Sequence, residues 1–193
     1  MNNAIEVNNI EGRKAVSSIG MTVLLVSFAM LFATLLLGYV VFRLTNDVWP
    51  PMGLKRIPLT LPTISTFIIG VSSLFFYNFE KAFNRNNLKM MRLQFGLTLL
   101  MGVCFMLVQF ELWSSMKELG LYVSGGAYPS LFFSLTWIHA AHIVMALISL
   151  FFLVPTLSTG FREDRITWVM NVGKFWHFLG LIWLVMYIVM FVY

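Results

Sequence analysis

Three histidines are the residues of this chain that, by their type and spacing, could bind a metal ion or a haem. His139 and His142 lie three positions apart in the apolar stretch TWIHAAHIVMAL, and His177 lies in a second apolar stretch closer to the C-terminus. Residues three apart share one face of a helix, so the first two imidazoles could bind one metal ion or face a haem. Ionisable groups inside apolar, membrane-crossing stretches are functional candidates by default.

A metal or haem site would need ligands that the sequence does not place together. Counted from the same end of their helices at 1.5 Å per residue, His177 would lie about 12 Å deep and His142 about 20 Å deep. Three histidines at such depths cannot hold two bis-imidazole haems. The single cysteine, Cys104, excludes a disulfide within the chain and a cysteine-based metal cluster. We therefore expect no metal and no cofactor in this chain.

The alternative for each imidazole is a structural role. A neutral ring can donate to a carbonyl or hydroxyl group on a neighbouring helix and accept from another, and Ser134, Thr136 and Ser149 lie nearby in the sequence. No carboxylate is expected at mid-membrane depth, which disfavours a proton path. The chain has no Ser/His/Asp set, phosphate loop or HExxH motif, so we expect no catalytic residue in it.

The elements that must position these residues are membrane-spanning helices. Of the 193 residues, 59% are hydrophobic and 11% charged, a balance typical of integral membrane proteins. The sequence predicts an all-α bundle of five transmembrane helices in one domain, residues 19–193, after a short, mobile cytoplasmic tail, residues 1–18. The stretches long enough to cross about 30 Å of hydrocarbon cover residues 19–43, 59–79, 90–113, 129–156 and 169–193.

The net charge of +5 indicates topology rather than nucleic-acid binding, because the basic residues are spread over the short ends of the helices. Nine of them lie in the tail and in the second and fourth connections, and four lie on the other side. The positive-inside rule then predicts a cytoplasmic N-terminus and a periplasmic C-terminus. The nine are Arg13, Lys14, Lys81, Arg85, Lys89, Arg92, Arg162, Arg165 and Lys174, and the four are Arg43, Lys55, Arg56 and Lys117.

Several sequence motifs follow one another along residues 19–193, and their order is more informative than any one of them. IGMTVLLVSFAMLFATLLLGYVVFR is followed by WPPMG, IPLTLPTISTFIIGVSS and FMLVQFELW. Next come GGAYPSLFFSLTWIHAAHIVMAL, with its aromatic residues, threonine and paired histidines, and finally FWHFLGLIWLVMY. This order resembles subunit III of the haem-copper respiratory oxidases. Five spans rather than seven would make the chain the short bacterial form, which lacks the first two helices.

The resemblance implies a non-catalytic subunit of a proton-pumping terminal oxidase, which reduces dioxygen to water. Haem and copper would then belong to partner subunits. The implied partners are the catalytic subunit I, other oxidase subunits and the phospholipids of a bacterial inner membrane, with a larger respiratory supercomplex left open. The candidates for structural or lipid contacts are Arg43, Trp49, Gln109, Glu111, His139, His142, Trp176 and His177.

The chain departs from the family pattern where acidic residues are usual. Phe28 follows Ser27 at a place where the family usually has glutamate, and Gly180 stands where an aspartate commonly follows the Trp-His-Phe motif. We therefore predict no buried carboxylate in this subunit for a carboxyl-modifying reagent to reach. Three other readings stay open: the equivalent subunit of a quinol oxidase, a small membrane transporter and a membrane cytochrome.

Overall fold

The computed structural model describes residues 2–46 and 58–192, without the side chains of residues 2–10, 163 and 164. Every regular element in these ranges is helical. Five of the helices are long and apolar enough to cross a membrane, which confirms the predicted all-α, multi-pass architecture. The elements are α1 (Asn2–Leu44), α2 (Thr60–Asn84), α3 (Leu88–Glu118), α4 (Ala127–Phe151), the short α5 (Thr156–Thr159), α6 (Glu163–Tyr187) and a terminal π-helical turn (Ile188–Val192).

The first helix is longer than the sequence predicts. Residues 1–18 were expected as a short, mobile tail, yet the backbone is helical from Asn2 and continues into the apolar stretch without a break. The physical reason is local, because no proline interrupts this segment and Gly12 is its only strong helix breaker. Over Glu11–Leu44, where its side chains are described, this helix is long and apolar enough to cross a membrane.

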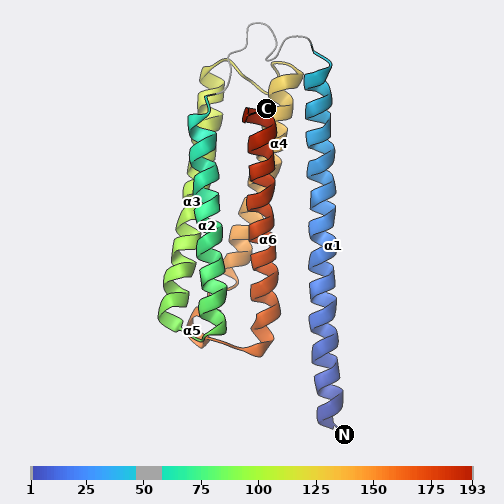
Figure 1. Cartoon of the computed structure of the whole chain (residues 1–193), viewed down its shortest axis with the longest axis vertical. Coiled ribbons are helices and arrows are strands. Elements are labelled where there is room, and N and C mark those ends of the chain that lie inside the picture. Colours follow the sequence, from blue (N-terminus) through green and yellow to red (C-terminus); the bar gives the residue numbers. More distant parts are fainter. Residues whose placement is uncertain (1, 47–57, 193) are drawn as a thin grey trace.

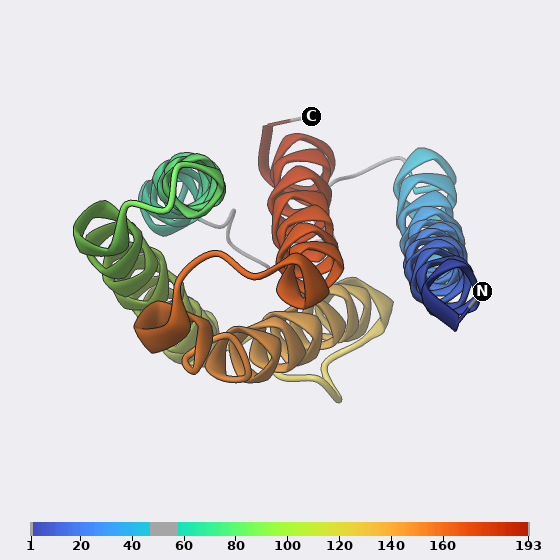
Figure 2. The ribbon, with the colours of Figure 1, turned by 90° about the horizontal axis from the view of Figure 1, so that it is seen from below.

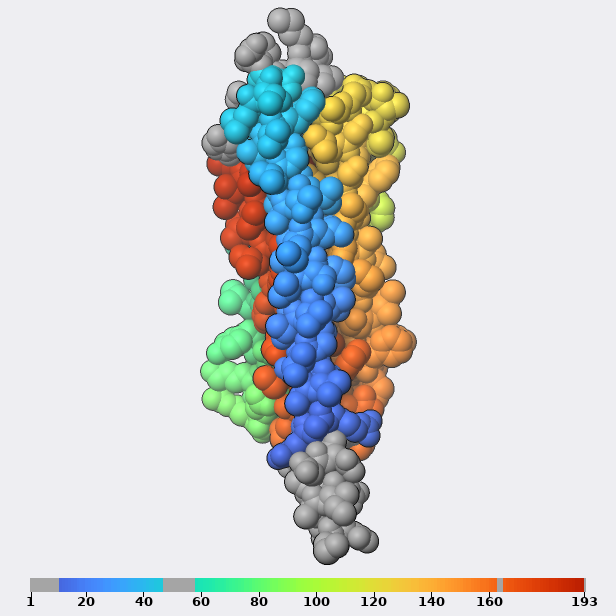
Figure 3. All heavy atoms as spheres, turned by 90° about the vertical axis from the view of Figure 1, so that its right-hand side faces the viewer, coloured from blue at the N-terminus to red at the C-terminus, as the bar shows by residue number. Residues whose placement is uncertain are grey.

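The helices form a bundle with α6 near its centre (Figures 1 and 2). α2 and α3 run antiparallel as the most closely packed pair, and α6 contacts α1, α2 and α4. α1 lies at the edge of the bundle, across α4 and α6 (Figure 3). Among the apolar side chains of its residues 11–44, only Phe32, Leu36 and Tyr39 are buried, so most of this part of the helix surface faces outwards.

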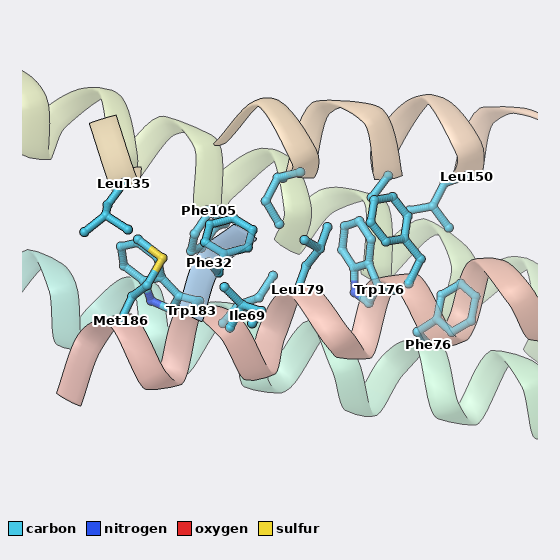
Figure 4. Packing of buried hydrophobic residues seen from close by; sticks show 14 of the residues in the cluster. Phe32, Ile69, Phe76, Phe105, Leu135, Leu150, Trp176, Leu179, Trp183 and Met186 are labelled. Carbon is cyan, nitrogen blue, oxygen red and sulfur yellow. The ribbon is translucent and has the colours of Figure 1, made fainter. Parts of the chain in front are cut away.

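Large aromatic side chains and small residues hold α6 in place. Trp176 and Trp183 are fully buried (Figure 4). The indole nitrogen of Trp183 donates to Thr66 Oγ1 of α2 at 3.0 Å. Trp176 fits against Gly102 of α3, where an added Cβ would lie only 2.7 Å from the ring carbon Cη2. Close approach of helices at small residues is a common way for membrane bundles to pack.

The tail, the α2–α3 connection and the α4–α6 connection lie at one end of the bundle (Figure 1). Hydrogen bonds join them: Arg92 Nε donates to Leu157 O at 2.9 Å, and Lys174 Nζ donates to Ser18 Oγ at 3.4 Å. The nine basic residues of the sequence are therefore gathered at this end, which we call the basic end. Of the four others, Arg43 and Lys117 lie at the opposite end, and Lys55 and Arg56 lie outside the described residues.

We expect the basic end to face the cytoplasm. An alkaline phosphatase joined after Asn86 should then be inactive, whereas one joined after Tyr193 should be active in the periplasm. A fusion after Ser124, in the α3–α4 connection, serves as a control because it shares the opposite end and should also be active. The reverse pattern of activities would overturn the orientation.

Candidate functional site

His139 lies at the centre of the bundle, where four helices meet. Its side chain is fully buried. The ring lies among aromatic rings of three other helices, with centroids 6.0 Å from Phe32, 5.9 Å from Phe105 and 5.3 Å from Trp183. Neither ring nitrogen has a hydrogen-bond partner in the part of the chain that the structure describes. His139 therefore acts in this fold as an aromatic packing residue that joins α1, α3, α4 and α6.

The hydrogen bonds predicted for His139 are not formed by the three hydroxyl side chains named for it. Thr136 Oγ1 accepts from Trp113 Nε1 at 3.1 Å and donates to a carbonyl one turn earlier in α4. Ser149 donates to its own helix, and Ser134 is exposed. The prediction was wrong because serine and threonine in a helix readily bond the carbonyl four residues earlier.

His142 also bonds within its own helix rather than between helices. Its Nδ1 lies 2.6 Å from Ile138 O, and because a carbonyl oxygen only accepts, the nitrogen must be the donor. Between helices, its contacts are aromatic: Phe28 meets the imidazole edge-on at a centroid distance of 4.3 Å, and Phe32 lies at 5.4 Å. The position where the family pattern has a carboxylate thus holds an apolar ring that packs on His142.

The remaining candidates differ in burial. Gln109 and Trp176 are buried, and the amide of the first and the indole nitrogen of the second have no hydrogen-bond partner among the described residues. Arg43 is partly buried at the end of α1, and Glu111 is exposed on α3. Trp49 lies outside the described residues. Their roles in structural or lipid contacts stay predictions.

His177 lies apart from the other two histidines, in a recess between α2 and α6. The recess has a volume of about 250 Å³ and also includes Glu80 and Lys174 in its lining. Its imidazole packs edge-on against Phe76 of α2 at 5.9 Å. The three histidines therefore do not form one donor set. Within residues 11–46, 58–162 and 165–192, no three histidine, cysteine, aspartate or glutamate side chains are grouped closely enough to hold a metal ion.

Glu80 is a carboxylate that lies partly between helices, near the helix end where the sequence places it, and the expected lack of a buried carboxylate stays a prediction. It lies four residues before the end of α2 and is half-buried. Its Oε1 rests against the backbone of Gly173 in α6, so closely that a methyl group on that glycine would overlap the oxygen. The sequence places Glu80 near a helix end, but only the pairing of α2 with Gly173 shows that the carboxyl group lies between helices.

Comparison with known proteins agrees with this architecture. The family model described as cytochrome c oxidase subunit III matches residues 8–193. The cytochrome c oxidase subunit 3 of Synechocystis sp. is 24% identical over 191 residues, covering 96% of this chain and 79% of the relative. The probable cytochrome c oxidase subunit 3 of Nocardia farcinica is 31% identical over 170 residues, which cover 86% of this chain and 83% of the relative. The cytochrome c oxidase subunit 3 of Oryctolagus cuniculus is 27% identical over 148 residues, which cover 72% of this chain and 53% of the relative.

The match reaches from the first helix to the last residue, so it includes all five spanning helices and the three histidines. Sequence and architecture lead to the same assignment: the chain belongs to the cytochrome c oxidase subunit III family.

Proposed function

We propose that this chain is the non-catalytic subunit III of a proton-pumping cytochrome c oxidase in a bacterial inner membrane. The observation that carries the proposal is the family match over residues 8–193. The bacterial relatives support the short five-helix form, since 79% of the Synechocystis protein and 83% of the Nocardia protein are covered, against 53% of the rabbit protein.

The work of the subunit in this proposal is to brace the catalytic subunit and to bind phospholipid. The donor chemistry of the described residues fits neither haem nor copper, because the buried histidine at the bundle centre is enclosed by aromatic rings and its neighbour bonds its own helix. Haem and copper would therefore reside in partner subunits, together with the reduction of dioxygen to water.

The outward face of α1 suits such a bracing role. Side chains along it are apolar and exposed, including Val23, Met30 and Leu37, which are 60%, 68% and 63% exposed. An apolar helix face can meet either lipid or another transmembrane helix, so this surface is compatible with contact to subunit I as well as to acyl chains.

Purification of the tagged chain in mild detergent tests the proposal. The chain should carry along a larger subunit with haem bands, and the assembly should oxidise reduced cytochrome c while consuming dioxygen. Oxidation of a quinol instead would identify the equivalent subunit of a quinol oxidase. Recovery of the chain alone, or with partners that contain no haem, would contradict membership of an oxidase complex.

A further inference from the structure

One face of α2 consists of polar and small residues, although α2 is one of the five helices that could cross a membrane. Residues that lie alternately four and three positions apart share one side of a helix, and such a side is where two helices pack. At these positions α2 carries no aliphatic side chain. They are Thr66, Gly70, Ser73, Tyr77, Glu80 and Asn84, which we call the α2 stripe.

The α2 stripe begins where α2 meets α6 and continues onto the surface. Ser73 lies beside α6, because a Cβ added at Gly180 would be 3.2 Å from its Oγ. A Cβ added at Gly70, in contrast, would meet nothing within 4 Å, and Tyr77 is 57% exposed. In Figure 2, α3 and α4 lie below the line that joins α2 and α6, and no helix lies above it. This side of the α2–α6 contact is therefore open in the described part of the chain.

Three polar side chains border this open side and form no hydrogen bond or ion pair with the residues that the structure describes. They are Ser73, Glu80 and His177, and each is partly exposed. Lys174 lines the same recess as Glu80 and His177, but its Nζ donates to Ser18 of α1. Polar groups without partners are costly in hydrocarbon, because no water is there to bond them. The open side therefore favours a neighbour that supplies hydrogen bonds and a positive charge.

Acyl chains do not meet this requirement. They suit the outward face of α1 and the outward side of α2, where Phe67 is 73% exposed, since these surfaces are apolar. A second transmembrane helix fits the α2 stripe better, because membrane helices approach each other at small residues and are joined by polar ones. Gly70 has no side chain to hold another helix away. Glu80, near the basic end, matches a basic side chain on that helix.

We propose that the open side of the α2–α6 contact is the docking face for one transmembrane helix of a partner subunit. This helix lies against Gly70 and Tyr77, and a lysine or arginine near its cytoplasmic end pairs with Glu80 in the recess of about 250 Å³. The proposal rests on the proposed function only in placing the chain in an oxidase complex. Which subunit supplies the helix is identified by the test.

Photo-crosslinking in the intact membrane tests the docking face. p-Benzoylphenylalanine replaces Tyr77 on the α2 stripe or, as the matched control, Phe67 on the outward side of the same helix. After irradiation the tagged chain is purified, its haem bands are recorded, and crosslinked peptides are identified by mass spectrometry. The probe at residue 77 should link to a membrane-spanning segment of another subunit that carries a lysine or arginine near its cytoplasmic end. The probe at residue 67 should link to lipid.

Three results would contradict the docking face: only lipid adducts at residue 77, equal linkage to protein from residues 77 and 67, or linkage of residue 77 to a segment without a basic residue. In each case, a sample that retains its haem bands leaves the proposed function intact. A chain that purifies without any haem-containing subunit refutes the proposed function instead. Crosslinks formed in the membrane before purification still report on the docking face in that sample.

Gly70→Leu should prevent docking without disturbing the chain itself. Residue 70 has open space within the chain, so a leucine there blocks only an incoming helix. The subunit that residue 77 crosslinks should then be lost from the purified assembly. The matched control is Gly96→Leu on α3, where an added Cβ also meets nothing within 4 Å, and this variant should retain the subunit. Retention of the subunit in both variants would rule out the docking face.

The pairing of Glu80 is tested by its charge. Glu80→Gln should lower the yield of the crosslink at residue 77 several-fold, and Glu80→Lys should abolish it, because like charges across an interface repel. Changing the basic residue of the partner helix to glutamate in the Glu80→Lys background should restore the product. If neither change of Glu80 lowers the yield, the charge pair does not form and the proposed partner helix is wrong.

Discussion

Replacing Gly102 by alanine should destabilise the subunit, although alanine is the better helix former. The added methyl group would lie 2.7 Å from Trp176 Cη2 and 3.0 Å from Leu147 Cδ2. Trp176 is fully buried, so its ring has no free space into which to turn. Overpacking of this kind costs typically about 1–3 kcal/mol, and Gly102→Leu should prevent α3 from packing on α6 at all. Thermal unfolding of the purified complex, with retention of this subunit, measures both effects.

The matched control is Gly96→Ala in the same helix. A Cβ at Gly96 meets nothing within 4 Å, so this change should be neutral or stabilising, by up to about 1 kcal/mol from helix propensity. Gly96→Leu should likewise leave the subunit in the complex. If both glycines tolerate leucine equally, the close contact between α3 and α6 does not exist as described.

These two glycines show what the sequence predicts and what it leaves open. Hydrophobicity and length predict five spans, and the span boundaries agree with the helices to within several residues at most ends. Gly96 and Gly102 look alike in the sequence, because each stands in an apolar stretch. Only the packing of α3 against α6 distinguishes a glycine that faces outwards from one that must accommodate an indole ring.

Polar residues in the bundle were harder to predict than the spans. Glu80 was assigned to a helix end, and its position along the chain is indeed near the end of α2. Its partial burial depends on Gly173, which lies more than 90 residues later in the sequence, and no local pattern reports such a contact.

The histidines illustrate a second limit. Spacing shows that His139 and His142 share a face of α4, and both are buried as that face requires. Spacing does not show the chemistry of what they meet. The neighbouring helices present Phe28, Phe32 and Trp183 to them rather than carbonyl or hydroxyl groups, so packing replaces the expected hydrogen bonds between helices.

His139→Phe should leave the stability of the subunit unchanged or raise it, whereas His139→Ala should lower it by roughly 2–5 kcal/mol. The ring of His139 packs among three aromatic side chains, and its nitrogens bond none of the described residues. A phenyl ring therefore keeps the packing and removes two buried polar atoms, while alanine leaves a cavity. Thermal unfolding of the complex and its haem spectrum should be recorded together for each variant.

The order of the variants distinguishes packing from ligation. If the imidazole only fills space, stability should fall from phenylalanine through glutamine to alanine as the ring volume is lost, and the haem bands should be the same in all variants that assemble. His142→Phe serves as the control, since it loses the bond to Ile138 O and should cost about 1 kcal/mol.

A metal or haem ligand would behave differently: phenylalanine and alanine would both abolish the same band or the same stoichiometric metal, whatever their effect on stability. Loss of the band in His139→Phe, which keeps the packing, would show that the imidazole is a ligand. This chain would then be a redox carrier in its own right.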